Sequence, residues 1–144
     1  MSRDIVEGLN DVVTSIDPFG PDLQTLQKND EYLIKINYFQ KEGKWPLNTT
    51  KAEIRLLLPL ANSLFLDSRA VWIRLSDINY PRTALWLPKI YQKRAMCEAH
   101  GSTLGGHDGL KKTYLRLTNA YFWPNMKKDI QTHIESCLQC QEQK

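Results

Sequence analysis

Two histidines and a closely spaced cysteine pair are the residues of this chain best suited to chemistry. Six residues separate His100 from His107, and 29 more lead to the Cys-x-x-Cys pair formed by Cys137 and Cys140. Two imidazoles and two thiolates make a complete tetrahedral ligand set for Zn²⁺. Because the protein would supply all four ligands, no position remains for a reactive water. The pattern therefore predicts a structural zinc site and not a catalytic one.

Two further side chains compete for a place at this site. Cys97 lies three residues before His100, but we expect it on the opposite side of its helix, as a partly exposed thiol. His133 lies one helical turn before Cys137, and we expect it to pack or hydrogen-bond near the metal. A Cys97–His100 nucleophile is disfavoured because no third, activating group is apparent.

Composition and length limit the class of protein. At 144 residues, with 42% hydrophobic residues, the chain fits one ordinary globular domain or two small ones. It contains no apolar run of the ~20 residues that a membrane span requires, and its N-terminus has no secretory-signal pattern. Three cysteines, two of them in one pair, do not suggest a disulfide framework and favour a reducing compartment.

Positive charge is concentrated near the candidate ligands. Residues 89–144 carry nine lysines and arginines against five acids, whereas residues 1–88 carry ten against eleven. This asymmetry favours a nucleic-acid partner for the C-terminal part. A solvated helical surface would explain the same charges without any partner.

The residues before this basic part predict a small mixed domain. Residues 1–20 read as an N-terminal arm that ends in the breaker run Asp17-Pro18-Phe19-Gly20. Over residues 21–87, apolar periodicity predicts two or three helices, including one over 31–41 capped by Asn29 or Asp30 and a second that begins at Thr49 or Thr50. Short apolar runs predict strands over 63–66, 70–75 and 83–87 in an antiparallel sheet. We therefore expect an α+β domain.

Helical periodicity returns over residues 88–144 and predicts an all-α, zinc-stabilised bundle. One helix ends at His100, the next is capped by Asp108, and Pro124 suits the first turn of the last. Inward positions are expected at Leu110, Tyr114, Leu117, Tyr121, Met126, Ile130, Ile134 and Cys137. Phe122 and Trp123 are expected in the core and not as base-stacking platforms. Lysines and arginines lie on the opposite helical faces.

The segment over about 95–142 resembles the HHCC zinc-binding domain of retroviral and gypsy-type long-terminal-repeat retrotransposon integrases. The likeness rests on a spaced series of motifs: His100, Gly106-His107, Gly109 to Thr113, Tyr121 to Pro124, Met126 to Asp129, and Cys137 to Gln141. His133 stands where these families usually carry an aromatic residue. Such integrases often place a small extension domain before the zinc domain, and the elements over 21–87 fit that layout.

The resemblance implies a non-catalytic, N-terminal region of a DNA integrase. In these families the catalytic core, with two Asp and one Glu, follows the zinc domain, so the nucleotidyltransferase chemistry is expected elsewhere in a Pol polyprotein product. The implied roles are integrase multimerisation and binding of element-end DNA, with the catalytic core and other integrase protomers as partners. Cytoplasmic particles and the nucleus are the implied locations.

The resemblance also implies which residues contact DNA, and it leaves two readings of the gene's origin. The side chains expected near DNA phosphates are Lys111, Lys112, Arg116, Lys127 and Lys128. The alternative reading is a host-domesticated, integrase-derived module that acts in protein–protein interaction or DNA targeting. A downstream catalytic core with an intact acidic triad would favour the integrase.

Overall fold

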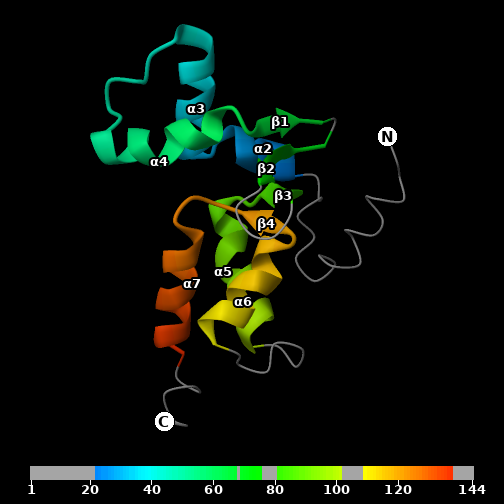
Figure 1. Ribbon diagram of the computed structural model, residues 1–144. Helices are drawn as coiled ribbons and strands as arrows, with labels where there is room; N and C mark the ends of the chain where they lie inside the picture. Colours follow the sequence, from blue (N-terminus) through cyan, green and yellow to red (C-terminus); the bar gives the residue numbers. More distant parts are fainter. Residues whose placement is uncertain (1–21, 68, 76–80, 102–108, 138–144) are drawn as a thin grey trace. The chain divides into compact units, whose positions relative to one another are not determined.

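The computed structural model describes residues 22–67, 69–75, 81–101 and 109–137 (Figure 1). The chain divides into two compact units, one that ends at Pro88 and one in which Lys89 begins the described part. Within these residues the structure has six helices together with short β-strands. The expected mixed α+β composition is therefore confirmed. The arm expected over residues 1–20 lies outside the described residues.

Three helices form the first part of the N-terminal unit: α2 (Leu23–Lys28), α3 (Glu31–Glu42) and α4 (Lys51–Ala61). Helix α3 begins where the Asp30 carboxylate accepts hydrogen bonds from the backbone N–H groups of Tyr32 and Leu33, at 2.9 and 3.0 Å. It ends at Gly43, whose φ of 74° is left-handed and favours glycine. Both ends of α3 are thus encoded locally.

Helix α4 begins with a capping box. The Glu53 N–H donates to Thr50 Oγ1 at 3.0 Å, and the Thr50 N–H donates to Glu53 Oε1 at 2.9 Å. The Glu53 carboxylate also accepts hydrogen bonds from Lys35 Nζ, at Oε1 over 3.0 Å and at Oε2 over 2.9 Å. Since Lys35 lies on α3 and is buried, Glu53 joins the start of α4 to the neighbouring helix.

The strands β1 (Leu64–Leu66), β2 (Val71–Leu75) and β3 (Arg82–Trp86) form an antiparallel meander. Leu64 pairs with Ile73 in the first ladder, and Ile73 pairs with Ala84 in the second. Helices and strands of this unit share one apolar core. Its fully buried members include Leu23, Ile36, Leu57, Ile73, Leu85 and Trp86.

A buried glutamine ties α2 to the sheet. Gln27 is 3% exposed. Its Nε2 donates to the carbonyl oxygens of Trp86 and Val71, at 2.8 and 3.2 Å, and its Oε1 accepts from the Val71 N–H at 2.8 Å. The amide therefore satisfies backbone groups at the ends of both β2 and β3 that would otherwise be buried without partners.

The second unit contains α5 (Lys89–Gly101), α6 (Leu110–Thr118), β4 (Tyr121–Phe122) and α7 (Met126–Glu135). The three helices pack pairwise against one another. The two-residue strand β4 corrects the expectation that this unit is all-α. Tyr121 and Phe122 have strong β-propensity, and they lie between the end of α6 and Pro124, where no helix competes for their backbone.

The start sites of the last two helices also differ from expectation. The N-cap of α6 is Gly109 and not Asp108, which lies outside the described residues. The N-cap of α7 is Asn125, with a left-handed φ of 67°, so Pro124 precedes the helix and is not part of its first turn. Asparagine is among the few residues that tolerate this conformation.

Burial in this unit follows the expected stripes in part. Leu117, Tyr121, Met126 and Ile130 are buried, as predicted. The remaining four predicted positions, Leu110, Tyr114, Ile134 and Cys137, are half-buried. Thr113 and Thr118 take buried places that the periodicity did not indicate. Among the described residues, no helix is long and apolar enough to cross a membrane.

Candidate metal centre

His100 and Cys137, two of the four predicted ligands, lie at the ends of packed helices. His100 is in the last turn of α5 and is 1% exposed. Cys137 follows α7, and its N–H donates to the Ile134 carbonyl at 3.1 Å, which continues the last turn. Its side chain is half-buried. Because α5 packs against α7, the fold presents one imidazole and one thiol from two adjoining helices.

The histidine His133 links these two positions. Its ring lies edge-on to that of His100, with centroids 6.0 Å apart and an interplanar angle of 86°. His133 is also one helical turn before Cys137. His100 and the C-terminal end of α7 are therefore at the same end of the helix pair. His133 therefore packs beside His100, and its place next to a metal stays a prediction.

Electrostatics at His133 favour a neutral ring. Burial lowers the pKa of His133 below its usual value, and the nearby His100 and Lys93 lower it further. A neutral imidazole is easier to accommodate beside His100 than a cation, because two charged rings would repel each other in a poorly solvated region. His133 thus adds bulk and shape to this end of the helix pair without adding charge.

The start of α7 is fixed by an aromatic side chain. Trp123 is 2% exposed, and its Nε1 donates to Asp129 Oδ2 at 2.9 Å. The expectation that Trp123 belongs to the core is confirmed. Asp129 lies in the first turn of α7, where a carboxylate also interacts favourably with the positive end of the helix dipole. The bond sets the position of the helix that leads to Cys137.

The donor chemistry of the described part fits zinc but does not complete a site. Within residues 22–67, 69–75, 81–101 and 109–137 there is no cluster of three or more His, Cys, Asp or Glu able to hold a metal ion. The predicted ligands His107 and Cys140 lie outside these ranges. A buried imidazole and a half-buried thiol at one end of a helix pair are suited to a tetrahedral N/S site. Cys97 is exposed, as expected.

The five cationic side chains expected near DNA are all exposed, on α6 and α7: Lys111, Lys112, Arg116, Lys127 and Lys128. Two of them also make contacts within the unit. Arg116 donates to the Ala99 carbonyl at 3.1 Å, and Lys127 Nζ is 5.8 Å from the centroid of the Tyr114 ring. These contacts hold the two charges close to the helix surface.

The sequence did not predict that the hydroxyl group of Tyr121 is buried. It has no hydrogen-bond partner among the described residues. Burial raises the pKa of Tyr121 well above its usual value, and the charge of Glu98 raises it further. Its place in the helical stripe that starts at Leu110 predicted the burial of the ring. No sequence signal indicates that the hydroxyl is buried with it.

Comparison with known proteins finds a family that the second unit resembles. Residues 87–144 match the family model of the integrase zinc binding domain. The chain is 34% identical over 53 residues to the Pro-Pol polyprotein of Simian foamy virus type 3, a match that covers 37% of this chain and 4% of the polyprotein. No solved structure matches the chain. Residues 87–144 are therefore similar to the integrase zinc binding domain, the family that the spaced histidine and cysteine motifs indicated.

Proposed function

We propose that this chain is the N-terminal, non-catalytic region of a retroelement integrase, which supports integrase multimerisation and binds element-end DNA. The observation that carries the proposal is the placement of His100. It is fully buried at the end of α5, beside the helix that leads to Cys137, inside a segment that matches the integrase zinc binding domain. The DNA-joining chemistry would then belong to a separate catalytic core.

His100, His107, Cys137 and Cys140 would hold the metal in this proposal. Zinc would act as a cross-link between the ends of α5 and α7, which compensates for the limited core of a unit of this size. Trp123 and Asp129 orient α7 from its other end. His133 packs against His100 and restricts its ring. None of these residues has a role in bond cleavage.

The exposed cations of α6 and α7 would meet the phosphates of element-end DNA. Lys111, Lys112 and Lys128 project into solvent, and lysine and arginine contacts to phosphate position a duplex without reading its sequence. The proposed working location is the nucleus, after cytoplasmic assembly in a particle. The proposed protein partners are the integrase catalytic core and other integrase protomers.

Zinc content and amide exchange of the whole chain test the metal assignment. We expect one zinc per chain, and chelation should increase exchange over residues 89–137 much more than over 22–88. Cys137→Ser should lose zinc, whereas Cys97→Ser, a substitution of an exposed thiol, should retain it. If the exchange of both units is unchanged after chelation, the structural role of zinc is refuted.

A further inference from the structure

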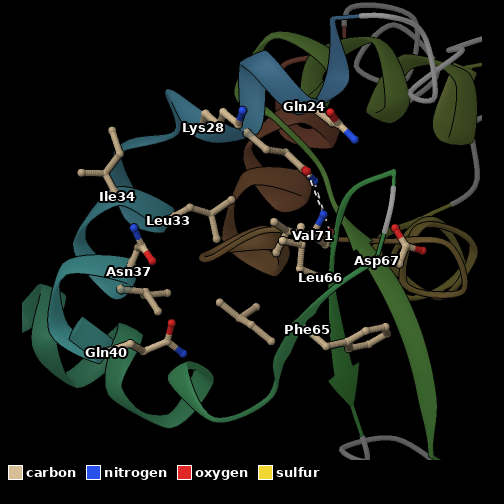
Figure 2. A pocket seen from close by; sticks show the side chains of 13 residues that line it. Gln24, Lys28, Leu33, Ile34, Asn37, Gln40, Phe65, Leu66, Asp67 and Val71 are labelled. Carbon is tan, nitrogen blue, oxygen red and sulfur yellow. Dashed lines mark hydrogen bonds between the residues drawn. The ribbon is translucent and has the colours of Figure 1, made fainter.

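An apolar groove opens in the N-terminal unit between α3 and the strand β1 (Figure 2). Its volume is about 620 Å³. The buried Leu33 and Ile36 and the half-buried Val71 contribute apolar surface to it. Ile34 and Leu66 line it with 49% and 74% of their surfaces exposed. Two large hydrophobic side chains thus remain in water on either side of a hollow.

The strand β1 presents an open edge. It occupies the end of the sheet, where β2 is its neighbour. The Arg74 N–H donates to the Ser63 carbonyl, and the Asp67 N–H donates to the Ala70 carbonyl. These two hydrogen-bonded pairs lie just before and just after the β1–β2 ladder and continue its register. Hydrogen bonding in an antiparallel ladder alternates along the strand. The N–H and C=O groups of Leu64 and Leu66 therefore point away from β2.

A peptide that binds as an added β-strand would use both the apolar groove and the open edge of β1. Main-chain groups on an open edge bind an extended peptide, and neighbouring pockets take its alternate side chains. A helix, about 10–12 Å across with its side chains, would leave the edge groups of β1 without partners. The groove therefore favours an extended segment over a helical one.

The charges of the groove favour an acidic residue at one end of this segment. Asp67 is already engaged, because its Oδ1 accepts from the N–H groups of Arg69 and Ala70 at 2.8 and 2.9 Å. Lys28 is exposed and forms no ion pair with any described residue. Lys28 is the next residue after Gln27, whose side chain bonds to Val71. Val71 in turn pairs with Leu66, the last residue of β1. Lys28 therefore lies toward the C-terminal end of β1.

We propose that this groove binds an extended apolar peptide, which adds to β1 as an antiparallel strand and carries a carboxylate near Lys28. In an antiparallel addition the peptide's N-terminal end faces the C-terminal end of β1. The ligand is thus an acidic residue followed by apolar residues at alternate positions. The site is confined to the N-terminal unit, and the proposal does not depend on the zinc or DNA assignments.

Fluorescence anisotropy with the whole, zinc-loaded chain tests the proposal. The probe is a labelled peptide, acetyl-Asp-Val-Thr-Val-Thr-Val-amide, and the reference replaces its Asp with Lys. Leu66→Pro removes an outward N–H while sparing the β1–β2 bonds, as edge strands allow, and should weaken binding by about tenfold or more. Lys28→Glu should reverse the preference between the two peptides, by about two- to fivefold.

Matched controls separate the groove from general hydrophobicity and misfolding. Leu47 is the most exposed large hydrophobic residue described, and it does not line the groove. Leu47→Ser should therefore keep the peptide affinity that Leu66→Ser loses. Circular dichroism of each variant must show an intact fold.

Three outcomes would overturn the proposal. The first is no binding of either peptide at millimolar concentration. The second is binding that Leu66→Pro leaves unchanged in a folded variant. The third is self-association of the chain through β1 that the peptide does not displace, since this would assign the edge to a second copy of the chain.

Discussion

The side chain of Gln27 bonds to the backbone of Val71 in both directions. Its Oε1 accepts from the Val71 N–H at 2.8 Å, and its Nε2 donates to the Val71 carbonyl at 3.2 Å. The amide thus pairs with Val71 as a neighbouring strand would, and it adds a bond to the Trp86 carbonyl at 2.8 Å. Helix α2 is thereby fixed to the sheet by polar bonds as well as by apolar packing.

Removal of this amide should destabilise the N-terminal unit. Gln27→Leu leaves the Trp86 carbonyl and both backbone groups of the half-buried Val71 without their side-chain partner. An unpaired group costs about 1–3 kcal/mol when it is fully buried and less where water reaches it. We expect a total loss of roughly 2–4 kcal/mol in the free energy of unfolding. Amide exchange resolved by segment would show the loss over residues 22–88. Gln24→Leu, on the exposed side of the same helix, is the control and should change stability by less than about 0.5 kcal/mol. Equal effects of the two variants would contradict the assigned role.

Glu53 should make the N-terminal unit sensitive to acid. The backbone hydrogen bond from Thr50 lowers the pKa of Glu53 below its usual value, and Lys35 lowers it further. A depressed folded-state pKa adds stability that is fully present above the unfolded-state pKa and is lost as pH falls through the folded-state value. Glu53→Gln should therefore flatten the pH dependence of unfolding below about pH 5. Denaturant unfolding at a series of pH values measures this slope, and Glu42→Gln, an exposed substitution on α3, should leave it unchanged.

The bond from Trp123 to Asp129 should control the start of α7. Asp129→Ala removes a charged acceptor from a buried indole N–H and a favourable charge from the first turn, at a cost of about 1–3 kcal/mol. Amide exchange over residues 126–135 should increase, and zinc should bind more weakly because the helix that carries Cys137 is less ordered. Lys128→Ala, an exposed change in the same turn, is the control for helix propensity. Normal protection of α7 in Asp129→Ala would show that the bond is dispensable.

Charge reversal on α7 should weaken DNA binding. Lys127→Glu with Lys128→Glu should lower affinity for duplex DNA at low salt and reduce the slope of log K against log salt by about two. The matched control is Lys41→Glu with Lys44→Glu, which makes the same charge change at exposed positions of the other unit. If both pairs reduce affinity equally, net charge and not a surface on α7 governs binding. Undiminished affinity in the Lys127/Lys128 variant would place the DNA surface elsewhere.

Local sequence signals account for much of the helical framework. Asp30 and the Thr50-x-x-Glu53 box start α3 and α4 in the structure, because capping bonds span only two or three residues. The burial of His100, Trp123 and Ile130 follows from helical periodicity and aromatic size. Such features depend on neighbours in the chain and can be read before any tertiary contact is known.

Long-range relationships could not be read in the same way. The partners of Gln27 are 44 and 59 residues away, and a polar residue in a short helix gives no indication of them. The buried Tyr121 hydroxyl and the left-handed Asn125 depend on how α6 and α7 pack. Only the motif spacing, compared with the integrase pattern, connected His100 to Cys137. The positions of His107 and Cys140 stay a prediction.

Different interactions stabilise the two ends of α7, so the helix should unfold from one end first. At its first turn the left-handed Asn125 and the Trp123–Asp129 bond are intrinsic to the polypeptide. Beyond its last turn, the position of Cys137 would depend on an exchangeable ion in the proposed domain. Loss of that ion should therefore fray α7 backward from its C-terminus and stop near Asp129. A metal-depleted chain would keep a short, tethered stub of the helix from which refolding can resume.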